Sequence, residues 1–414
     1  MGGAAGPTRP TAFARYWAAA TINALGTAVT GVAMPVLVVQ LLAATPFEVG
    51  VVNAAQFVPY ALLGLIAGVY ADRWRRRTLL VWASVGRAVS LGSVPILWLL
   101  GVLQVWMLVI ALLAFGAFSV FGFAASQSLL PRLVSPTQLL SVNARLDQTD
   151  AAAQTLGPAL GGGLVAVLGA PVAIAVDSIS YLVDAALNAG IRVDEPRPTR
   201  APATRRSEIR EGLRWTYRHP TLGPLALSTH VWFIANGAAM TVLSLLALRV
   251  LAFSALSYGL LLTVFGLATL AGASLAPRTS MRLGPGRAIG AARLVYPLAW
   301  LLVAVATPTG AGGVLLFVAL ALQGLAMGLE NSPEQVLWQT LTPDELLGRA
   351  NATRRSANRT LAAIGALTAG AAVGAVGDRI ALVGVIVIFT AAAVVALLSP
   401  LRGVTTLPRS DGTA

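Results

Sequence analysis

The sequence has no cysteine and no lysine, and it has only two histidines, His219 and His230. Without cysteine the chain can form no disulfide, no thiolate metal site and no cysteine nucleophile. The two histidines are too few and too far apart in the sequence for a histidine-rich metal site. A glycine-rich phosphate loop with its lysine and a G-x-S-x-G nucleophile elbow are also missing. We therefore expect no metal, no cofactor and no enzyme activity.

The sequence also has few charged residues. Only 11% of the 414 residues are charged, whereas 57% are hydrophobic, and the mean hydropathy is +0.77. A soluble protein carries about 25% charged residues, so this chain cannot cover a globule with polar surface. The composition therefore predicts a multi-pass membrane protein whose solvent is the lipid bilayer.

Long apolar runs fill most of the chain, and a helix needs about 20 apolar residues to cross a bilayer. Polar residues, proline and glycine divide the sequence into twelve such runs. The expected spans lie near 15–41, 47–71, 78–100, 104–131, 139–167, 171–191, 221–249, 255–277, 287–306, 311–339, 346–375 and 380–400. We therefore predict an all-α membrane protein with twelve transmembrane helices.

The positions of the arginines predict how the helices are oriented. With the N-terminus in the cytoplasm, most arginines fall in inner loops or adjoining helix ends, for example Arg132, Arg278 and Arg349. The outer side then has essentially only Arg249 and Arg379. Because arginine-rich loops stay in the cytoplasm, we expect both termini inside. The net charge of +13 thus reflects topology, and nucleic acid is not an expected partner. The lysine-free, arginine-rich usage is typical of a GC-rich bacterial genome, so we expect a bacterial plasma membrane.

An internal repeat divides the chain into two halves. The segment SPTQLLSVNAR at 135–145 corresponds to TPDELLGRANAT at 342–353, with an offset of 207 to 208 residues. Two duplicated six-helix halves are the expected arrangement of a secondary transporter. We expect an N-terminal bundle at 1–192, a cytoplasmic central loop at 193–220 and a C-terminal bundle at 221–414.

The second part of the central loop predicts a short amphipathic helix over 207–218. An apolar stripe that includes Leu213 and Tyr217 is flanked there by Arg210, Arg214 and Arg218. Such a helix either lies on an anionic inner leaflet or links the two halves through solvent. The sequence leaves both interpretations open.

The loop after the second span carries a transporter motif, GVYADRWRRR at 68–77. It resembles the signature G-x-x-x-D-R-x-G-R-R of the major facilitator superfamily, except that Arg75 stands where the second glycine is usual. The matching residues are Gly68, Asp72, Arg73, Arg76 and Arg77. The resemblance spans nearly the whole chain, and segments such as LLPRLVSPTQLLSVNA and EIREGLRWTYRHPTL are similar to the enterobactin-exporter and macrolide-efflux branch. It implies two pseudo-symmetric six-helix bundles, a monomer and alternating access.

The resemblance also implies a gate at this loop. We expect Asp72 to accept hydrogen bonds from the N-terminus of the eleventh span, where the helix dipole is positive. That contact would hold the two halves together on the inner side. The neighbouring arginines would pair with acids and lipid phosphates.

Ionisable residues within spans are costly in lipid and are therefore candidate coupling residues. Asp147 and Asp150 share one face of the fifth span, and the repeat places Arg355 of the eleventh span at the position of Asp147. A bridge between Asp147 and Arg355 is predicted to close the inner side in one state. Glu330 in the tenth span is either a proton carrier or the structural partner of a nearby arginine.

Other polar residues in the spans divide into two groups. Where this fold lines its cavity, the sequence places amides and an aromatic residue, which suit a bulky amphipathic substrate. These substrate-cavity candidates are Asn23, Gln56, Gln127, Trp232, Asn236 and Asn358. In the sixth span, Asp177, Tyr181, Asp184 and Asn188 share one face, for which we expect a packing role.

The predicted function is proton-coupled efflux of a bulky amphipathic small molecule, such as a drug, an antibiotic or a siderophore. Small-molecule substrate, protons and lipid are thus the expected partners. Two alternatives stay open: uptake of a small solute, and a non-exporting receptor or lipid flippase on the same scaffold.

Overall fold

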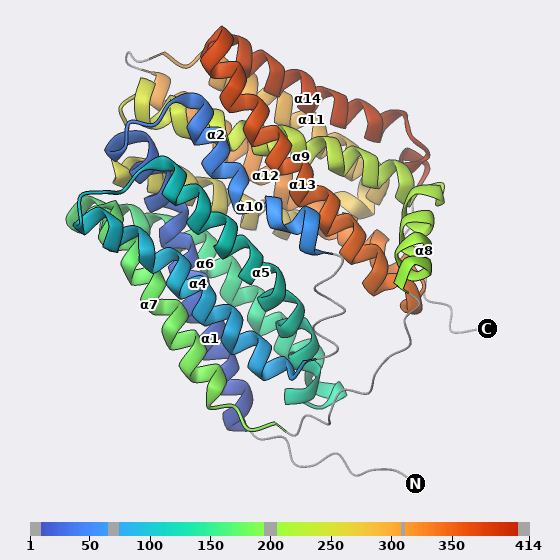
Figure 1. Cartoon of the computed structure of the whole chain (residues 1–414). Helices are drawn as coiled ribbons and strands as arrows, with labels where there is room; N and C mark the ends of the chain where they lie inside the picture. The colour runs from blue at the N-terminus through green and yellow to red at the C-terminus, as the bar shows by residue number, and fades with distance from the viewer. Residues whose placement is uncertain (1–9, 65–73, 194–204, 308–310, 405–414) are drawn as a thin grey trace. The chain divides into compact units, whose positions relative to one another are not determined.

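The computed structural model describes residues 10–64, 74–193, 205–307 and 311–404 (Figure 1). These residues are almost entirely helical and contain no strand. Eleven helices among them, of 20 to 33 residues each, are long and apolar enough to cross a membrane. The second expected span begins as α2, Pro46–Ala55, continues as helix at 58–64 and then enters residues outside the described ranges. The predicted all-α membrane class is confirmed.

The described helices form two compact units. In unit 1, α1 packs against α6 and α7, and α4 packs against α5 and α7. Its helices are α1 (Pro10–Val36), α4 (Arg76–Leu99), α5 (Val105–Leu133), α6 (Leu139–Leu168) and α7 (Ala170–Ala189), together with residues 254–260 at the start of α10.

Unit 2 contains the rest of α10, together with α2 and the helices that follow the central loop. In this unit α9 packs against α13 and α14, α11 against α12 and α14, and α2 and α8 against α13. Its further helices are α8 (Arg205–Arg218), α9 (Leu222–Leu245), α10 (Ala255–Leu283), α11 (Pro285–Ala304), α12 (Gly312–Leu341), α13 (Asp344–Val376) and α14 (Asp378–Leu398).

Two unusual backbone features recur 209 residues apart. The first span ends in a π-helical turn at Leu37–Leu41, and the seventh ends in one at Leu246–Val250. Each turn is followed by an alanine with positive φ, 47° at Ala43 and 51° at Ala252. Residues other than glycine rarely adopt such a φ. Its recurrence at matching places agrees with the repeat seen in the sequence.

Glycines allow helices within each unit to approach closely. A Cβ on Gly162 of α6 would lie 3.2 Å from the Cα of Gly259, at the start of α10 in unit 1. In unit 2, a Cβ on Gly50 of α2 would lie 3.1 Å from the Cα of Gly370 in α13. Small residues at such crossings provide the van der Waals packing that holds helices together in lipid.

Glycines also allow α10 and α12 to cross closely in unit 2. A Cβ on Gly328 would lie 2.1 Å from the backbone oxygen of Thr269 and 2.5 Å from the backbone nitrogen of Ala273. Gly324, one turn earlier on α12, meets the backbone oxygen of Phe265 at 2.2 Å. Both contacts involve backbone atoms, so a side chain here can be accommodated only by moving a helix.

We therefore expect Gly328→Leu to destabilise the protein, by about 1–3 kcal/mol or more, since overpacking costs at least that much in a tight interior. Gly384→Leu in α14 is the matched control, because no atom lies within 4 Å of a Cβ at Gly384. Thermal unfolding of the purified variants in detergent measures the difference. Equal melting temperatures for the two variants would contradict the predicted close crossing.

Candidate functional site

The most deeply buried charge of unit 2 is Arg293, in the middle of α11. Its side chain is only 1% exposed, and it lies between two carboxylates of α12. Nε donates to Oε2 of Glu330 at 3.0 Å, and Nη2 donates to Oε2 of Glu334 at 3.0 Å. Glu330 and Glu334 are four residues apart on α12, which places them on one face of that helix. One guanidinium therefore holds two acids of the neighbouring helix.

Hydroxyl groups of α9 complete the contacts of Arg293. The guanidinium donates to Ser228 and, at 2.8 Å, to Thr229. The hydroxyl of Ser228 donates a hydrogen bond to the backbone oxygen of Ala392 in α14 at 2.6 Å. The hydroxyl of Thr229 donates to Glu334 at 3.1 Å. Buried polar groups are costly unless each is hydrogen-bonded. These contacts meet that requirement for the arginine.

Glu330 is equally well satisfied. It is 3% exposed, and its second oxygen accepts a hydrogen bond from the hydroxyl of Tyr296 at 2.8 Å. Tyr296 stacks on Phe389, with ring centroids 5.2 Å apart, and lies edge to face with Trp232. An aromatic wall thus covers the carboxylate and shields it from water.

A second layer connects Glu334 to α13. Arg354 lies 3.7 Å from Glu334, and its guanidinium is placed over the ring of Trp338. The inner and outer layers together contain two arginines and two glutamates, so their formal charges cancel. We call the four side chains of Arg293, Glu330, Glu334 and Arg354 the charge network.

His230 of α9 lies beside this network. Its Nδ1 is 2.6 Å from Oδ1 of Asn358 in α13, and its Nε2 is 2.8 Å from the hydroxyl of Tyr217 in α8. With the amide oxygen as acceptor, Nδ1 carries the proton, and Nε2 accepts from Tyr217. Partial burial raises the pKa of Tyr217, so its hydroxyl stays protonated and able to donate at neutral pH. The imidazole therefore links the central-loop helix to the interior of unit 2.

Unit 1 contains a similar arginine in α4, the third span. Arg87 lies 3.8 Å from Asp184 of α7 and 4.5 Å over the ring of Tyr181. Ser84 donates to Asp184 and accepts from Arg87 at 2.9 Å. Arg87 and Arg293 occur in the third helix of each half, 206 residues apart, close to the offset of the repeat. Arg87 is partly buried and Arg293 fully buried, and each is paired with an acid.

Asp177 on α7 is a second acid of unit 1, and its hydrogen-bond partners are hydroxyl groups. It is fully buried, and it accepts hydrogen bonds from Thr30 of α1 and, at 3.0 Å, from Ser180. Tyr181 of the same face exchanges a 2.8 Å hydrogen bond with Thr27. Together with the Arg87 contacts, the polar face of the sixth span therefore joins α7 to α1 and α4.

The signature loop lies largely outside the described residues. Gly68, Asp72 and Arg73 fall within 65–73, and their predicted gate role stays a prediction. Arg76 and Arg77 begin α4 and are partly buried. Arg77 donates to the backbone oxygen of Ile191 at 2.8 Å, which fastens the start of α4 to the chain just after α7.

Three of the coupling candidates are not among the four residues of the charge network. Asp147 and Asp150 are exposed on α6 of unit 1, and Arg355 is partly buried on α13 of unit 2. The bridge between Asp147 and Arg355 stays a prediction. Glu330, the fourth candidate, lies at the centre of the network, paired with Arg293.

The substrate-cavity candidates occupy varied surroundings. Trp232 and Asn358 are buried, Trp232 within the aromatic wall and Asn358 against His230. Asn23 of α1 is partly buried and accepts from Thr27 at 3.2 Å. The remaining candidates are partly buried, at Gln56 and Asn236, or exposed, at Gln127. Their contact with a substrate stays a prediction.

Sequence reasoning missed Arg87, Arg293 and His230. The signal was present, since each is an ionisable residue inside a run long enough to span a membrane, and such residues are functional candidates by default. Arginines in loops indicate topology, but Arg87 and Arg293 lie inside spans, where topology does not explain them.

Comparisons with known proteins identify the family. The family model described as transmembrane secretion effector matches residues 2–412. The MFS-type transporter YfiS of Bacillus subtilis is 28% identical over 374 residues, covering 84% of this chain and 83% of YfiS. The multidrug efflux pump Tap of Mycolicibacterium fortuitum is 30% identical over 238 residues, covering 56% of this chain and 57% of Tap.

Solved structures support the fold. A crystal structure of a mutant of the nucleoside transporter NupG matches with a TM-score of 0.72 and 12% identity, covering 93% of this chain and 98% of that one. A bacterial homologue of the human lysosomal transporter Spinster, in an inward-facing and occupied conformation, matches with a TM-score of 0.71 and 13% identity. That match covers 97% of this chain and 98% of the homologue. The resemblance found in the sequence is confirmed: the chain is a multi-pass membrane transporter rather than an enzyme, and it belongs to the transmembrane secretion effector family of the major facilitator superfamily.

Proposed function

We propose that this protein exports a bulky amphipathic small molecule, such as a drug, an antibiotic or a siderophore, in exchange for protons. In this proposal it works by alternating access of an N-terminal half at 1–192 and a C-terminal half at 221–414. We place it in the plasma membrane of a bacterium, with both termini in the cytoplasm. The observation that carries the coupling mechanism is the charge network of unit 2.

The network has the properties that a proton-coupled switch requires. Arg293 pairs with both Glu330 and Glu334 at 3.0 Å, in a site where its own side chain is 1% exposed. A conformation in which a buried charge loses its partner is strongly destabilised. Protonation of Glu330 removes one negative charge and weakens its pairing with Arg293, so the helices that carry these residues then favour another arrangement. Release of the proton restores the pair.

The direction of transport rests on the relatives. Similarity to the multidrug efflux pump Tap favours export of amphipathic compounds. The structural match to a nucleoside transporter keeps uptake of a small solute as the second candidate. Antiport and symport differ in the gradient that drives accumulation, so one experiment distinguishes them.

Transport in proteoliposomes tests the proposal, with a cargo chosen by the drug and siderophore sensitivity of a deletion strain. Antiport predicts that cargo accumulates in vesicles with an acidic lumen, because protons leave as cargo enters. Glu330→Gln mimics the protonated carboxyl group and cannot release a proton. We expect it to abolish gradient-driven accumulation and to retain exchange of labelled for unlabelled cargo at equal pH.

The matched control is Glu345→Gln at the start of α13, where the side chain is exposed; this variant should accumulate cargo as the wild type does. Accumulation driven by an alkaline lumen would indicate symport and uptake. Absence of flux for every cargo would favour the receptor or flippase alternative. Gradient-driven accumulation by Glu330→Gln would exclude Glu330 as the proton carrier.

The pairing itself predicts a stability pattern. Arg293→Met leaves Glu330 buried without its cation, which costs about 3–5 kcal/mol. The double variant Arg293→Met with Glu330→Met removes both charges, so most of the lost stability should return. Thermal unfolding in detergent measures both, with exposed Arg278→Met as the control. If the double variant melts no higher than the single one, the two side chains do not stabilise each other as described.

A further inference from the structure

One face of α8 carries three arginines without an ion-pair partner in the described parts of the chain. Arg210, Arg214 and Arg218 are exposed. They are spaced four residues apart, so they form a stripe about 12 Å long on one side of the helix. Like charges at this spacing repel one another. The stripe therefore favours an anionic ligand.

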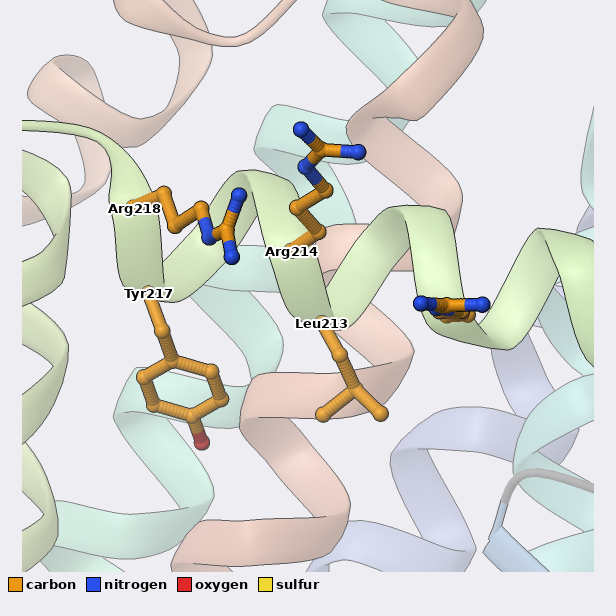
Figure 2. A pocket seen from close by; sticks show the side chains of 5 residues that line it. Leu213, Arg214, Tyr217 and Arg218 are labelled. Carbon is orange, nitrogen blue, oxygen red and sulfur yellow. The ribbon is translucent and has the colours of Figure 1, made fainter.

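The stripe borders an open cavity of about 490 Å³ (Figure 2). Besides the three arginines, Leu213 and Tyr217 line it. Figure 2 shows Leu213 and Tyr217 projecting from one edge of α8, Arg214 projecting from the opposite edge, and Arg218 running along the helix between them. The two apolar side chains are 40% and 44% exposed. The cavity thus has a cationic edge and an apolar edge.

Contacts with α13 hold α8 in place and leave the stripe uncovered. Glu211 of α8 pairs with Arg349 of α13 at 2.6 Å. Its carboxylate is therefore engaged with α13 and not with the arginine stripe. A Cβ on Gly212 would lie 3.1 Å from the Cβ of Arg349, and Thr216, one turn later, is buried. The face of α8 that contains Gly212 and Thr216 therefore packs inward. The arginine stripe faces outward.

The chain also places this cavity at the membrane surface. The span of α9 begins at Leu222, four residues after Arg218, and four residues reach at most about 14 Å. The end of α8 therefore lies within headgroup distance of the bilayer. An amphipathic basic helix at that depth is suited to anionic lipid.

We propose that Arg210, Arg214 and Arg218 bind the phosphate group of an anionic phospholipid, with Leu213 and Tyr217 against its apolar part. Arginine forks pair with phosphate oxygens two at a time. The apolar edge favours a lipid over a soluble anion. This site is separate from the charge network and does not depend on the cargo or on proton coupling.

Tyr217 connects the lipid site to the interior of unit 2. Its ring lines the cavity, and its hydroxyl lies 2.8 Å from Nε2 of His230, whose other ring nitrogen is bonded to Asn358. A lipid whose apolar part packs against the ring of Tyr217 also fixes this hydrogen bond. Lipid binding therefore stabilises the start of α9.

Native mass spectrometry of the purified protein tests the site, with phosphatidylglycerol or phosphatidylcholine added to the detergent. Wild type should retain phosphatidylglycerol in preference to phosphatidylcholine, and Arg210→Gln/Arg214→Gln/Arg218→Gln should lose it. The matched control removes three exposed arginines at the ends of α10 and α11, as Arg278→Gln/Arg282→Gln/Arg287→Gln. Retention by the α8 variant, or equal loss by the control, would overturn the proposal.

A second arm separates lipid from free phosphate. Phosphatidylglycerol should raise the melting temperature of the wild type and not that of the α8 variant, whereas inorganic phosphate should leave both unchanged. If inorganic phosphate stabilises the wild type as much as phosphatidylglycerol does, the site takes a soluble anion and the lipid assignment is wrong.

Hydrogen exchange in nanodiscs tests the connection through Tyr217. For the wild type, backbone amides of residues 219–226 should exchange more slowly in phosphatidylglycerol than in phosphatidylcholine. Tyr217→Phe keeps the ring and removes the hydroxyl, so it should bind the lipid normally and lose this slowing. The same slowing in Tyr217→Phe would show that the hydrogen bond to His230 does not transmit lipid binding.

Discussion

The interior of unit 2 depends on one guanidinium, that of Arg293, and on its two ion pairs with the carboxylates of Glu330 and Glu334. Arg293 bonds to both at 3.0 Å and to two hydroxyl groups of α9. Three helices therefore meet at one guanidinium. In lipid, helices gain little from burying apolar surface against each other, so packing and polar contacts decide their arrangement. A contact of this kind fixes the register of α9, α11 and α12.

Each half has an arginine in its third helix that pairs with acids, but the two arginines differ in the number and distance of those acids. Arg87 in unit 1 lies 3.8 Å from Asp184 and over the ring of Tyr181, whereas Arg293 has two acids at 3.0 Å. Duplication explains why both arginines exist. The two arginines differ in their partners, since Arg293 pairs with two carboxylates and Arg87 with one. This difference is the reason why the proposed proton site is in unit 2.

The sequence predicts the helices well because bilayer thickness sets their length, and runs of apolar residues are easy to count. It also indicates α8, whose arginine spacing and apolar stripe are local features. The partner of Glu330 was harder to predict. Arg293 is 37 residues away on another helix, and its choice among several acids depends on how α9 and α14 pack around it. Pairing of this type is decided by tertiary contacts that no single helix reveals.

Exclusive use of arginine has a physical consequence at both sites. The planar guanidinium has five donors in a fixed fork, whereas an ammonium group is a compact point charge with three. In the charge network, different nitrogens of Arg293 contact Glu330, Glu334 and the hydroxyls at the same time. On α8, the proposed lipid site uses the same geometry to pair with phosphate oxygens. Within the described residues, Arg293 is buried and paired with two acids, whereas Arg210, Arg214 and Arg218 of α8 are exposed and make no ion pair, which suits them to the proposed lipid site.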